Sequence, residues 1–300
     1  MATQDKLEIL NASLLDENRE LVNELKHVAA RMRMEFGWHY LLDLVWIIKN
    51  LDIENTHVAL DAGAGKGLIQ WYLASKGIDV LSVDRVNRKY LPLHYRKYFP
   101  VEGLRPQDFA TVGGSIFRLS WRAGGFGQKL RGFARDLVFL LRKKEHVPGS
   151  GKVIFYDQDL RTLTDIPSNS VDVVVAVSSL EHNQPDQLPV VVAELMRVLK
   201  PGGKLVATLS TTGDTDMYHE PSYGWVYSEA SMRSHFGLDA DTVSNYDQYP
   251  ELLEGLKNST ELKEGLAKFY FQSGEGGMPW GVWDPQYVPL GVCKVKPIEA

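Results

Sequence analysis

Three glycines at alternate positions follow the first apolar strand expected in this sequence. The strand covers residues 57–60 and continues into Asp61-Ala-Gly-Ala-Gly-Lys-Gly67, after which a helix is expected through Ser75. Glycine permits a tight turn and a close approach of a ligand to the backbone, and a helix N-terminus offers free N–H groups. The spacing G-x-G-x-G is neither that of a dinucleotide-binding fingerprint nor that of a G-K-[ST] phosphate loop. The segment therefore predicts a ligand-binding loop but does not name the ligand.

An acidic residue ends the second expected strand. This strand covers residues 79–83, and Asp84 stands at its tip, seventeen residues after Gly67. Two carboxylate oxygens at that place can accept hydrogen bonds from both hydroxyls of an adenosine ribose. With the glycine loop before it, we interpret Asp84 as a ribose-binding residue. The alternative is a solvated carboxylate at a strand end.

Strands and helices alternate through the middle of the chain. Further strands are expected at residues 153–156, 171–177 and 204–209, and a helix over residues 187–199 ends before Pro201-Gly202-Gly203. Such alternation predicts an α/β fold with a parallel sheet and helices on both faces. Ligands of these sheets bind at the carboxyl ends of the strands. The glycine loop, Asp84 and the residues after 177 are therefore expected to lie at one edge.

Five ordered segments resemble those of class I methyltransferases that use S-adenosylmethionine (SAM). Residues 59–67 resemble their motif I, and Ser82-Val-Asp84 resembles their acidic strand end. The segments YDQDL, SVDVVVAVSSLEH and LMRVLKPGGKL resemble the family's later motifs, at residues 156–160, 170–182 and 195–205. The Leu-Glu-His ending is common in the type 11 subgroup. The resemblance spans about residues 57–211, apart from a long basic insertion, and implies a Rossmann-like sheet, SAM as cofactor and S-adenosylhomocysteine (SAH) as product.

The same resemblance implies which residues bind the cofactor. The methionine part would lie along Asp61, Gly63 and Gly65, and Asp84 would hold the ribose. The adenine would face Asp159 and the backbone of Leu160, and Ser178 would lie beneath the sulfonium. The amino-acid end would be reached from residues before motif I, with Arg33, His39 and Tyr40 as candidates.

Methyl transfer from SAM requires few catalytic groups from the protein. Methyl transfer is an in-line displacement at an activated carbon, so the protein positions the acceptor and removes a proton from a hydroxyl. Histidine titrates near neutrality, and His182 follows the fourth strand, so we expect His182 as general base with Glu181 orienting it. A structural histidine is the alternative. His219 and Glu220 could share the pocket, and a metal site formed by Glu181, His182 and His219 is a further alternative, although no metal is expected.

Two absences bear on the acceptor. The sequence has no Asn-Pro-Pro-Tyr motif of the kind that resemblance associates with adenine methylation, and its one cysteine, Cys293, is remote from the fourth strand. We therefore expect a hydroxyl on a sugar, glycan or small metabolite, with nitrogen as the alternative atom. Trp280 and Trp283 could stack on such a ring or belong to the core.

A basic segment interrupts the family pattern between the second and third strands. From Arg85 to Lys144, fourteen Lys and Arg oppose three Asp and Glu, whereas the chain as a whole has a net charge of −5. A connection of about seventy residues is long enough to be functional or to carry its own structure, and this one is expected to form a helical lid. It could be a solvated surface or oligomer contact, a site for a phosphorylated or lipid-linked acceptor, or a docking surface for anionic lipid.

The chain divides by pattern into two parts. Residues 1–52 are expected to form an N-terminal helical region, in which the apolar stripe of residues 5–35 predicts a helix packed on its own domain or in a short coiled coil. Residues 53–300 would form the methyltransferase domain, with the basic insertion at 86–150 and a substrate-side region at 211–300, where residues 268–272 and 287–296 could add strands.

Composition limits the class of protein. With 44% hydrophobic and 24% charged residues, and no apolar run long enough for a membrane span, the sequence predicts a cytoplasmic globular protein. Peripheral membrane contact would come from the basic insertion. Two rival functions remain open: an RNA or protein methyltransferase that grips a polyanion through residues 85–144, and a SAM-binding regulatory or scaffold subunit without chemistry.

Overall fold

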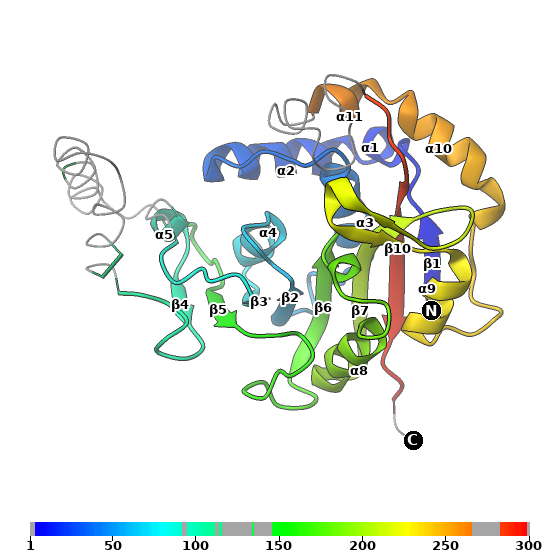
Figure 1. The fold of residues 1–300 in the computed structure, drawn as a ribbon. Helices are drawn as coiled ribbons and strands as arrows, with labels where there is room; N and C mark the ends of the chain where they lie inside the picture. The colour runs from blue at the N-terminus through cyan, green and yellow to red at the C-terminus, as the bar shows by residue number, and fades with distance from the viewer. Residues whose placement is uncertain are drawn as a thin grey trace.

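The central element is a mixed sheet of eight strands. The computed structural model describes residues 4–91, 95–111, 114–115, 134, 146–265 and 283–298. The strand order is β1-β10-β7-β6-β2-β3-β5-β4 (Figure 1). The strands are β1 Lys6–Ile9, β2 Val58–Ala62, β3 Asp79–Asp84, β4 Val101–Gly103, β5 Val153–Asp157, β6 Val171–Val177, β7 Leu199–Thr211 and β10 Val288–Val295. Strands β2 to β7 pair in parallel, and β10 is antiparallel to both β7 and β1. The predicted α/β fold is confirmed.

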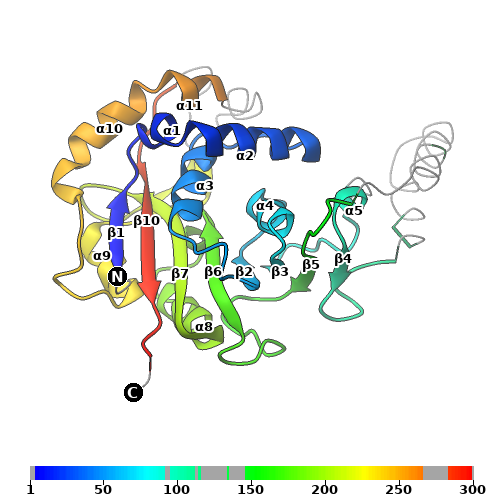
Figure 2. The same ribbon diagram turned by 180° about the vertical axis from the view of Figure 1, so that it is seen from behind.

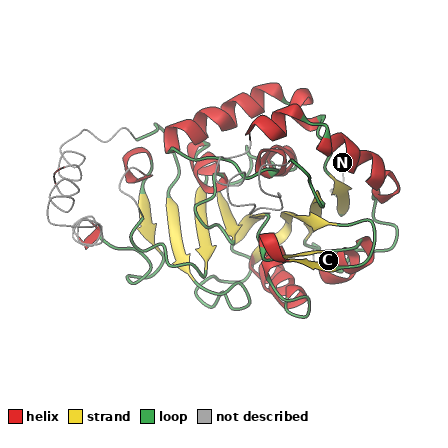
Figure 3. Cartoon of the chain, turned by 45° about the horizontal axis from the view of Figure 1, so that its top comes forward, coloured by secondary structure: helices red, strands yellow, loops and turns green. Residues whose placement is uncertain are grey.

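Helices cover both faces of the sheet (Figure 3). They are α1 Leu14–Glu17, α2 Arg19–Met32, α3 Tyr40–Lys49, α4 Ile69–Ser75, α5 Tyr95–Tyr98, α8 Leu188–Val198, α9 Glu229–Phe236, α10 Tyr249–Lys257 and α11 Thr260–Gly265. Helix α2 contacts both α3 and α4, and Figure 2 shows it running across them. None of the helices in the described ranges is long and apolar enough to cross a membrane.

The N-terminal region differs from its prediction. Residues 6–9 form strand β1 at the sheet edge, so a helix starting at residue 5 is wrong for this stretch. The reason is that burial alternates with a period of two residues, which is typical of a strand. Leu7 and Ile9 are buried in the core, whereas Lys6 and Glu8 are only partly buried. The apolar stripe of α2 is buried within its own chain, which favours the single-chain interpretation over a coiled coil. Strand β1 pairs with β10 and so belongs to the central sheet. The division of the chain into two parts at residue 52 stays a prediction.

The beginning of the basic insertion is part of the core. Strand β4 joins the sheet beside β5, and Trp71 of α4 stacks on Tyr95 at 5.1 Å and contacts Phe99 at 5.7 Å between ring centroids. The predicted helical lid falls mostly on residues 116–133 and 135–145, which lie outside the described residues, as does the strand expected at 268–272. The closing strand expected at 287–296 is confirmed as β10.

A close contact between α3 and β10 supplies the first testable prediction. A Cβ on Gly291 would lie 2.4 Å from the ring of Trp46, which is buried and whose Nε1 donates to Glu8 at 2.7 Å. We expect Gly291→Ala to lower the free energy of unfolding by about 1–3 kcal/mol, because the ring has no space to move. Gly255→Ala in α10 is the matched control, since no described atom outside the backbone of its own helix and its two chain neighbours lies within 4 Å of its added Cβ. In a helix it should raise stability by about 0.5–1 kcal/mol, and urea denaturation measures both.

Candidate cofactor and acceptor site

The glycine loop joins β2 to α4 and folds against the end of β6. Gly63 and Gly65 have φ values of +74° and +47°, which favour glycine. A Cβ on Gly63 would lie 2.6 Å from the Cβ of Ser179, whose Oγ donates to the Ala62 carbonyl at 2.7 Å. Only a residue without a side chain fits between the loop and the strand end.

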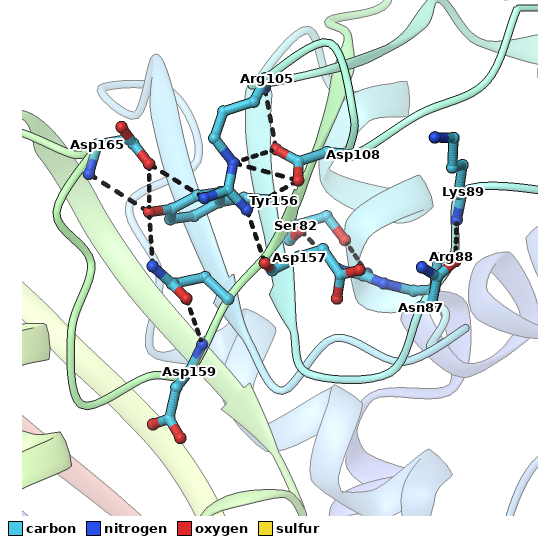
Figure 4. A network of polar contacts seen from close by, with 11 residues as sticks. Ser82, Asn87, Arg88, Lys89, Arg105, Asp108, Tyr156, Asp157, Asp159 and Asp165 are labelled. Carbon is cyan, nitrogen blue, oxygen red and sulfur yellow. Dashed lines mark hydrogen bonds and ion pairs between the residues drawn. The ribbon is translucent and has the colours of Figure 1, made fainter.

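Buried polar side chains support the loop from behind. Gln70 Nε2 donates to the Gly67 carbonyl at 3.0 Å, and its Oε1 accepts from Ser82 Oγ at 2.7 Å. Arg88 donates to Ser82 Oγ at 2.5 Å, to the Ser82 carbonyl at 2.7 Å and to the Gly65 carbonyl at 3.2 Å (Figure 4). Burial lowers the pKa of Arg88. Because these groups bind the loop's carbonyls, the loop is held in one conformation.

Asp84 binds the same loop. Its Oδ2 accepts the Gly65 N–H at 2.7 Å and its Oδ1 accepts the Val86 N–H at 2.7 Å. Each carboxylate oxygen has a second lone pair, so these bonds leave it able to accept from a ribose hydroxyl.

A cavity of about 340 Å³ lies between the loop and the N-terminal region. Of the predicted cofactor residues it brings together Asp61, Gly63, Gly65 and Ser178. It is covered by residues that the sequence did not single out, namely Met34, Glu35, Phe36 and Leu44, and also by Tyr40. Of the three candidates for the amino-acid end, Tyr40 therefore lines the cavity, whereas Arg33 and His39 do not.

The wall of this cavity contains the buried carboxylate of Asp61. Asp61 is 1% exposed, and its Oδ2 is buried without a hydrogen-bond partner among the described residues. Burial raises the pKa of Asp61 to about 7, although the nearby Arg88 guanidinium opposes the rise. A buried carboxylate oxygen without a partner suits a cationic donor. The α-ammonium group of SAM is such a donor, so the residues present fit the cofactor.

Asp159 and Leu160 do not line this cavity. The Asp159 carboxylate accepts from Arg161 at 2.8 Å, and this bond lowers the pKa of Asp159. Near it, Arg105 binds Asp108 and donates to the Asp157 carbonyl at 2.8 Å (Figure 4).

Three cations of the basic segment form hydrogen bonds within the fold and so have structural roles. Arg88 and Arg105 bind the strand ends as described above. Arg96 donates to the Ala110 carbonyl at 2.8 Å and lies 4.0 Å over the ring of Phe109.

A second cavity of about 200 Å³ adjoins the first. Both cavities are lined by Tyr40, Ser178 and His182, so they meet at these residues. The remaining walls of the second cavity are Gly37, Trp38, His39, Glu181, Ser210, Pro221, Ser222, Tyr223 and Tyr287. We name it the acceptor cavity.

His182 lies at the exposed side of the acceptor cavity. It ends the short helix η1 Leu180–His182, and its Nδ1 lies 3.0 Å from the carbonyl oxygen of Tyr223. A carbonyl can only accept, so Nδ1 carries the proton of the neutral ring and Nε2 carries the lone pair. Tyr223 (φ +52°) is held in the turn between β8 Met217–His219 and β9 Gly224–Val226. The hairpin thus fixes the ring in the tautomer that a general base needs.

Glu181 is buried beneath that turn. It is 3% exposed, its Oε1 accepts from Ser178 Oγ at 2.5 Å, and its Oε2 has no hydrogen-bond partner in the part of the chain that the structure describes. Burial raises the pKa of Glu181. Ser178 has φ +43°, a conformation that is strained for a residue with a side chain. The carboxylate thus bonds to Ser178, while the Tyr223 carbonyl orients His182.

His39 and Asp43 form a pair that the sequence reasoning did not identify. Both are buried, and His39 Nδ1 lies 2.6 Å from Asp43 Oδ2, one helical turn apart at the start of α3. His39 also lines the acceptor cavity. The signal was available in the sequence, because Asp43 is the one carboxylate in a helix that is apolar up to its last residue, Lys49, and it stands four residues after a histidine.

Other candidates have structural partners. His219 Nδ1 accepts the Ser222 N–H at the start of η2 Glu220–Ser222, and Glu220 is exposed. Trp283 packs on Trp38 and donates to the Lys257 carbonyl at 2.8 Å, so it belongs to the core, and Trp280 lies outside the described residues. Within the described ranges, no group of three or more His, Cys, Asp or Glu side chains is arranged to hold a metal ion.

Comparison with known proteins agrees with this architecture. Residues 109–207 match the family model Methyltransf_11, described as a methyltransferase domain. The matched segment contains Asp159, Leu160, Ser178, Glu181 and His182, whereas the glycine loop and Asp84 precede it. No curated protein matches the chain.

Solved structures with a similar chain trace include three proteins of named activity. The [4+2]-cyclase SpnF is 14% identical with a TM-score of 0.47, covering 99% of this chain and 100% of its own. A putative sarcosine dimethylglycine methyltransferase from Galdieria sulphuraria is 15% identical (TM-score 0.41, 85% of each chain). The 1,6-didemethyltoxoflavin-N1-methyltransferase of Burkholderia thailandensis, with SAH bound, is 14% identical (TM-score 0.42, 96% and 89%). At these values none of them assigns a substrate.

Residues 109–207 are thus a methyltransferase domain of type 11, which supports the predicted class of SAM-dependent methyltransferase. The type 11 domain match covers the later motifs, and the class predicted from the sequence, with SAM as its cofactor, is confirmed.

Proposed function

We propose that the protein methylates a hydroxyl group of a small polar acceptor, such as a sugar, a glycan unit or another metabolite. The observation that carries this proposal is the meeting of the cofactor cavity and the acceptor cavity at Tyr40, Ser178 and His182. A hydroxyl in the acceptor cavity would lie beside the reactive methyl group and beside a histidine in the correct tautomer. The volume of about 200 Å³ suits a molecule smaller than a typical drug.

The cofactor would be held by the loop and the strand ends. Asp61 would accept from the α-ammonium group, Asp84 from the ribose hydroxyls, and Gly63 and Gly65 would allow the close backbone approach. Asp159 and the Leu160 backbone stay assigned to the adenine by resemblance. Ser178, common to both cavities, would lie beneath the sulfonium.

The protein's chemical task is positioning and proton removal. SAM supplies a methyl carbon activated by its sulfonium, and the electron pair of the broken C–S bond stays on sulfur. The acceptor cavity would position the hydroxyl oxygen beside the cofactor cavity, at Tyr40, Ser178 and His182, where the two cavities meet. His182 Nε2 takes the hydroxyl proton as the new C–O bond forms, and the Tyr223 carbonyl stabilises the resulting imidazolium through Nδ1–H.

This role of His182 predicts a specific loss. We expect His182→Ala to lower turnover by about 10²–10⁴-fold, because general-base catalysis contributes that much, while SAH affinity changes little. The measurement is SAH release from SAM with a panel of neutral, amino and phosphorylated sugars, together with calorimetric SAH titration of both proteins. Full turnover in the variant would contradict the assignment and favour a structural histidine.

The distal part of the acceptor is a separate question. We propose that cations of the basic segment, residues 85–144, contact an anionic group there, such as a phosphate, or an anionic membrane surface to which the acceptor is attached. Among the described residues, none that lines the acceptor cavity is Lys or Arg. A polyanion-binding methyltransferase predicts binding that weakens steeply with salt, and a regulatory subunit predicts SAH binding without turnover on any acceptor.

A further inference from the structure

The inner end of the acceptor cavity contains a buried carboxylate oxygen without a partner. Glu181 is 3% exposed, and Ser178 occupies Oε1, but Oε2 has no hydrogen bond within the described structure. Burying such an oxygen costs free energy unless a donor meets it. Glu181 lines the cavity, so an entering ligand can supply that donor.

The charges around this oxygen select the kind of donor. None of the described residues that line the acceptor cavity is Lys or Arg, and its titratable side chains are His39, Glu181, His182, Tyr40, Tyr223 and Tyr287. A second carboxylate, Asp43, lies directly behind His39. Among the described residues, the cavity therefore has one lining carboxylate and a second behind its wall, without a permanent positive charge to balance them, which favours a cation and opposes an anion.

The walls suit the same kind of group. The rings of Trp38, Tyr40, Tyr223 and Tyr287 line the cavity, and Trp38 and Tyr287 pack edge to face with centroids 5.2 Å apart. Aromatic rings attract a desolvated ammonium group through their electron-rich faces. The His39–Asp43 pair, fixed by its 2.6 Å contact, adds a rigid polar wall.

We propose that the acceptor cavity contains a subsite for a protonated amine, in which Glu181 Oε2 accepts a charge-assisted hydrogen bond from the ammonium group. The proposal rests on the proposed function and narrows its substrate class. The acceptor then carries an amine beside the hydroxyl that is methylated, as an amino sugar or an amino alcohol does. The amine is held inside the cavity, and His182 faces the hydroxyl nearer the exposed side.

Three probes of equal size and different charge test the subsite. Ethanolamine, ethylene glycol and glycolate each carry one hydroxyl next to an ammonium, a hydroxyl or a carboxylate group. We expect ligand-observed NMR titration of the SAH complex to show ethanolamine binding at least about tenfold more tightly than ethylene glycol, and glycolate more weakly than both. Equal affinities, tighter glycolate, or no ethanolamine binding at 100 mM would overturn the subsite.

Two variants tie the result to one side chain. Glu181→Gln keeps an oxygen for the Ser178 hydroxyl and removes the charge, so it should reduce ethanolamine affinity to that of ethylene glycol. Asp186→Asn removes an exposed carboxylate five residues away and should change nothing. Unchanged ethanolamine affinity in Glu181→Gln would overturn the proposal. Absence of SAH binding by the wild-type protein would instead overturn the proposed function.

Discussion

Replacing Asp61 with asparagine is expected to stabilise the ligand-free protein at pH 8 while weakening its binding of SAM and SAH. Burial raises the pKa of Asp61 from an ordinary 3.8 to about 7. Between these values the folded state holds a proton that the unfolded state has lost. Stability therefore falls as pH rises from about 4 to about 7, and the full penalty is present above pH 7.

Asparagine removes this penalty because it carries no charge to bury. We expect Asp61→Asn to raise the free energy of unfolding by about 2–4 kcal/mol at pH 8, and to change it little at pH 4. The nearby Arg88 guanidinium favours the ionised form and limits the gain. Urea denaturation of both proteins at the two pH values measures the difference.

The same substitution should weaken the binding of SAH. Without the carboxylate, the α-ammonium group of SAH loses its charged partner, and affinity at pH 8 should fall by about 10–100-fold. If Asp61→Asn is less stable than the wild type at pH 8 and binds SAH equally well, the cofactor's α-ammonium group does not pair with the Asp61 carboxylate, and the assignment is wrong.

Gly63→Ala is expected to abolish cofactor binding through shape alone. Its φ of +74° is unfavourable for alanine by about 1–2 kcal/mol, and the new Cβ would lie 2.6 Å from that of Ser179. Ser179 is held by its bond to the Ala62 carbonyl, so the loop must move instead. Together these effects predict at least about a 100-fold loss of SAH affinity in a calorimetric titration.

Gly149→Ala separates the two causes. Gly149 has a similar φ of +70°, but no atom lies within 4 Å of its added Cβ, and the residue is exposed. Its alanine variant should lose about 1–2 kcal/mol of stability and bind SAH as the wild type does. Equal loss of SAH affinity in both variants, or in neither, would show that the contact with Ser179 does not shape the site.

The sheet was predictable because its strands have strong local signals. The valine-rich segment Val171–Val177, interrupted only by Asp172 and Ala176, predicts a strand buried on both faces, and it is strand β6. Strand β1 was not predictable in the same way, because Leu7 and Leu10 fit a helical stripe as well as a strand. Its identity depends on pairing with β10, almost three hundred residues later in the sequence.

The candidate site was predictable to a similar degree. Asp61 was singled out by its resemblance to motif I and His182 by its place after the fourth strand, and the structure puts both at the carboxyl edge of the sheet, beside the same cavity. Met34 lines the cofactor cavity and His39 lines the acceptor cavity. Both residues precede the family motifs in sequence, and only the packing of α3 brings them to the site. In sequence Arg88 is one of fourteen cations in the basic segment, and only the fold shows that it is buried behind the glycine loop.

A calorimetric titration of the purified protein with SAH, with Asp84→Ala in parallel, tests the central claim most directly. The structure predicts saturable binding at one site per chain, and loss of that binding in the variant, whose carboxylate holds Gly65 and would hold the ribose. No binding heat at millimolar SAH, or equal binding by both proteins, would contradict the cofactor site described here.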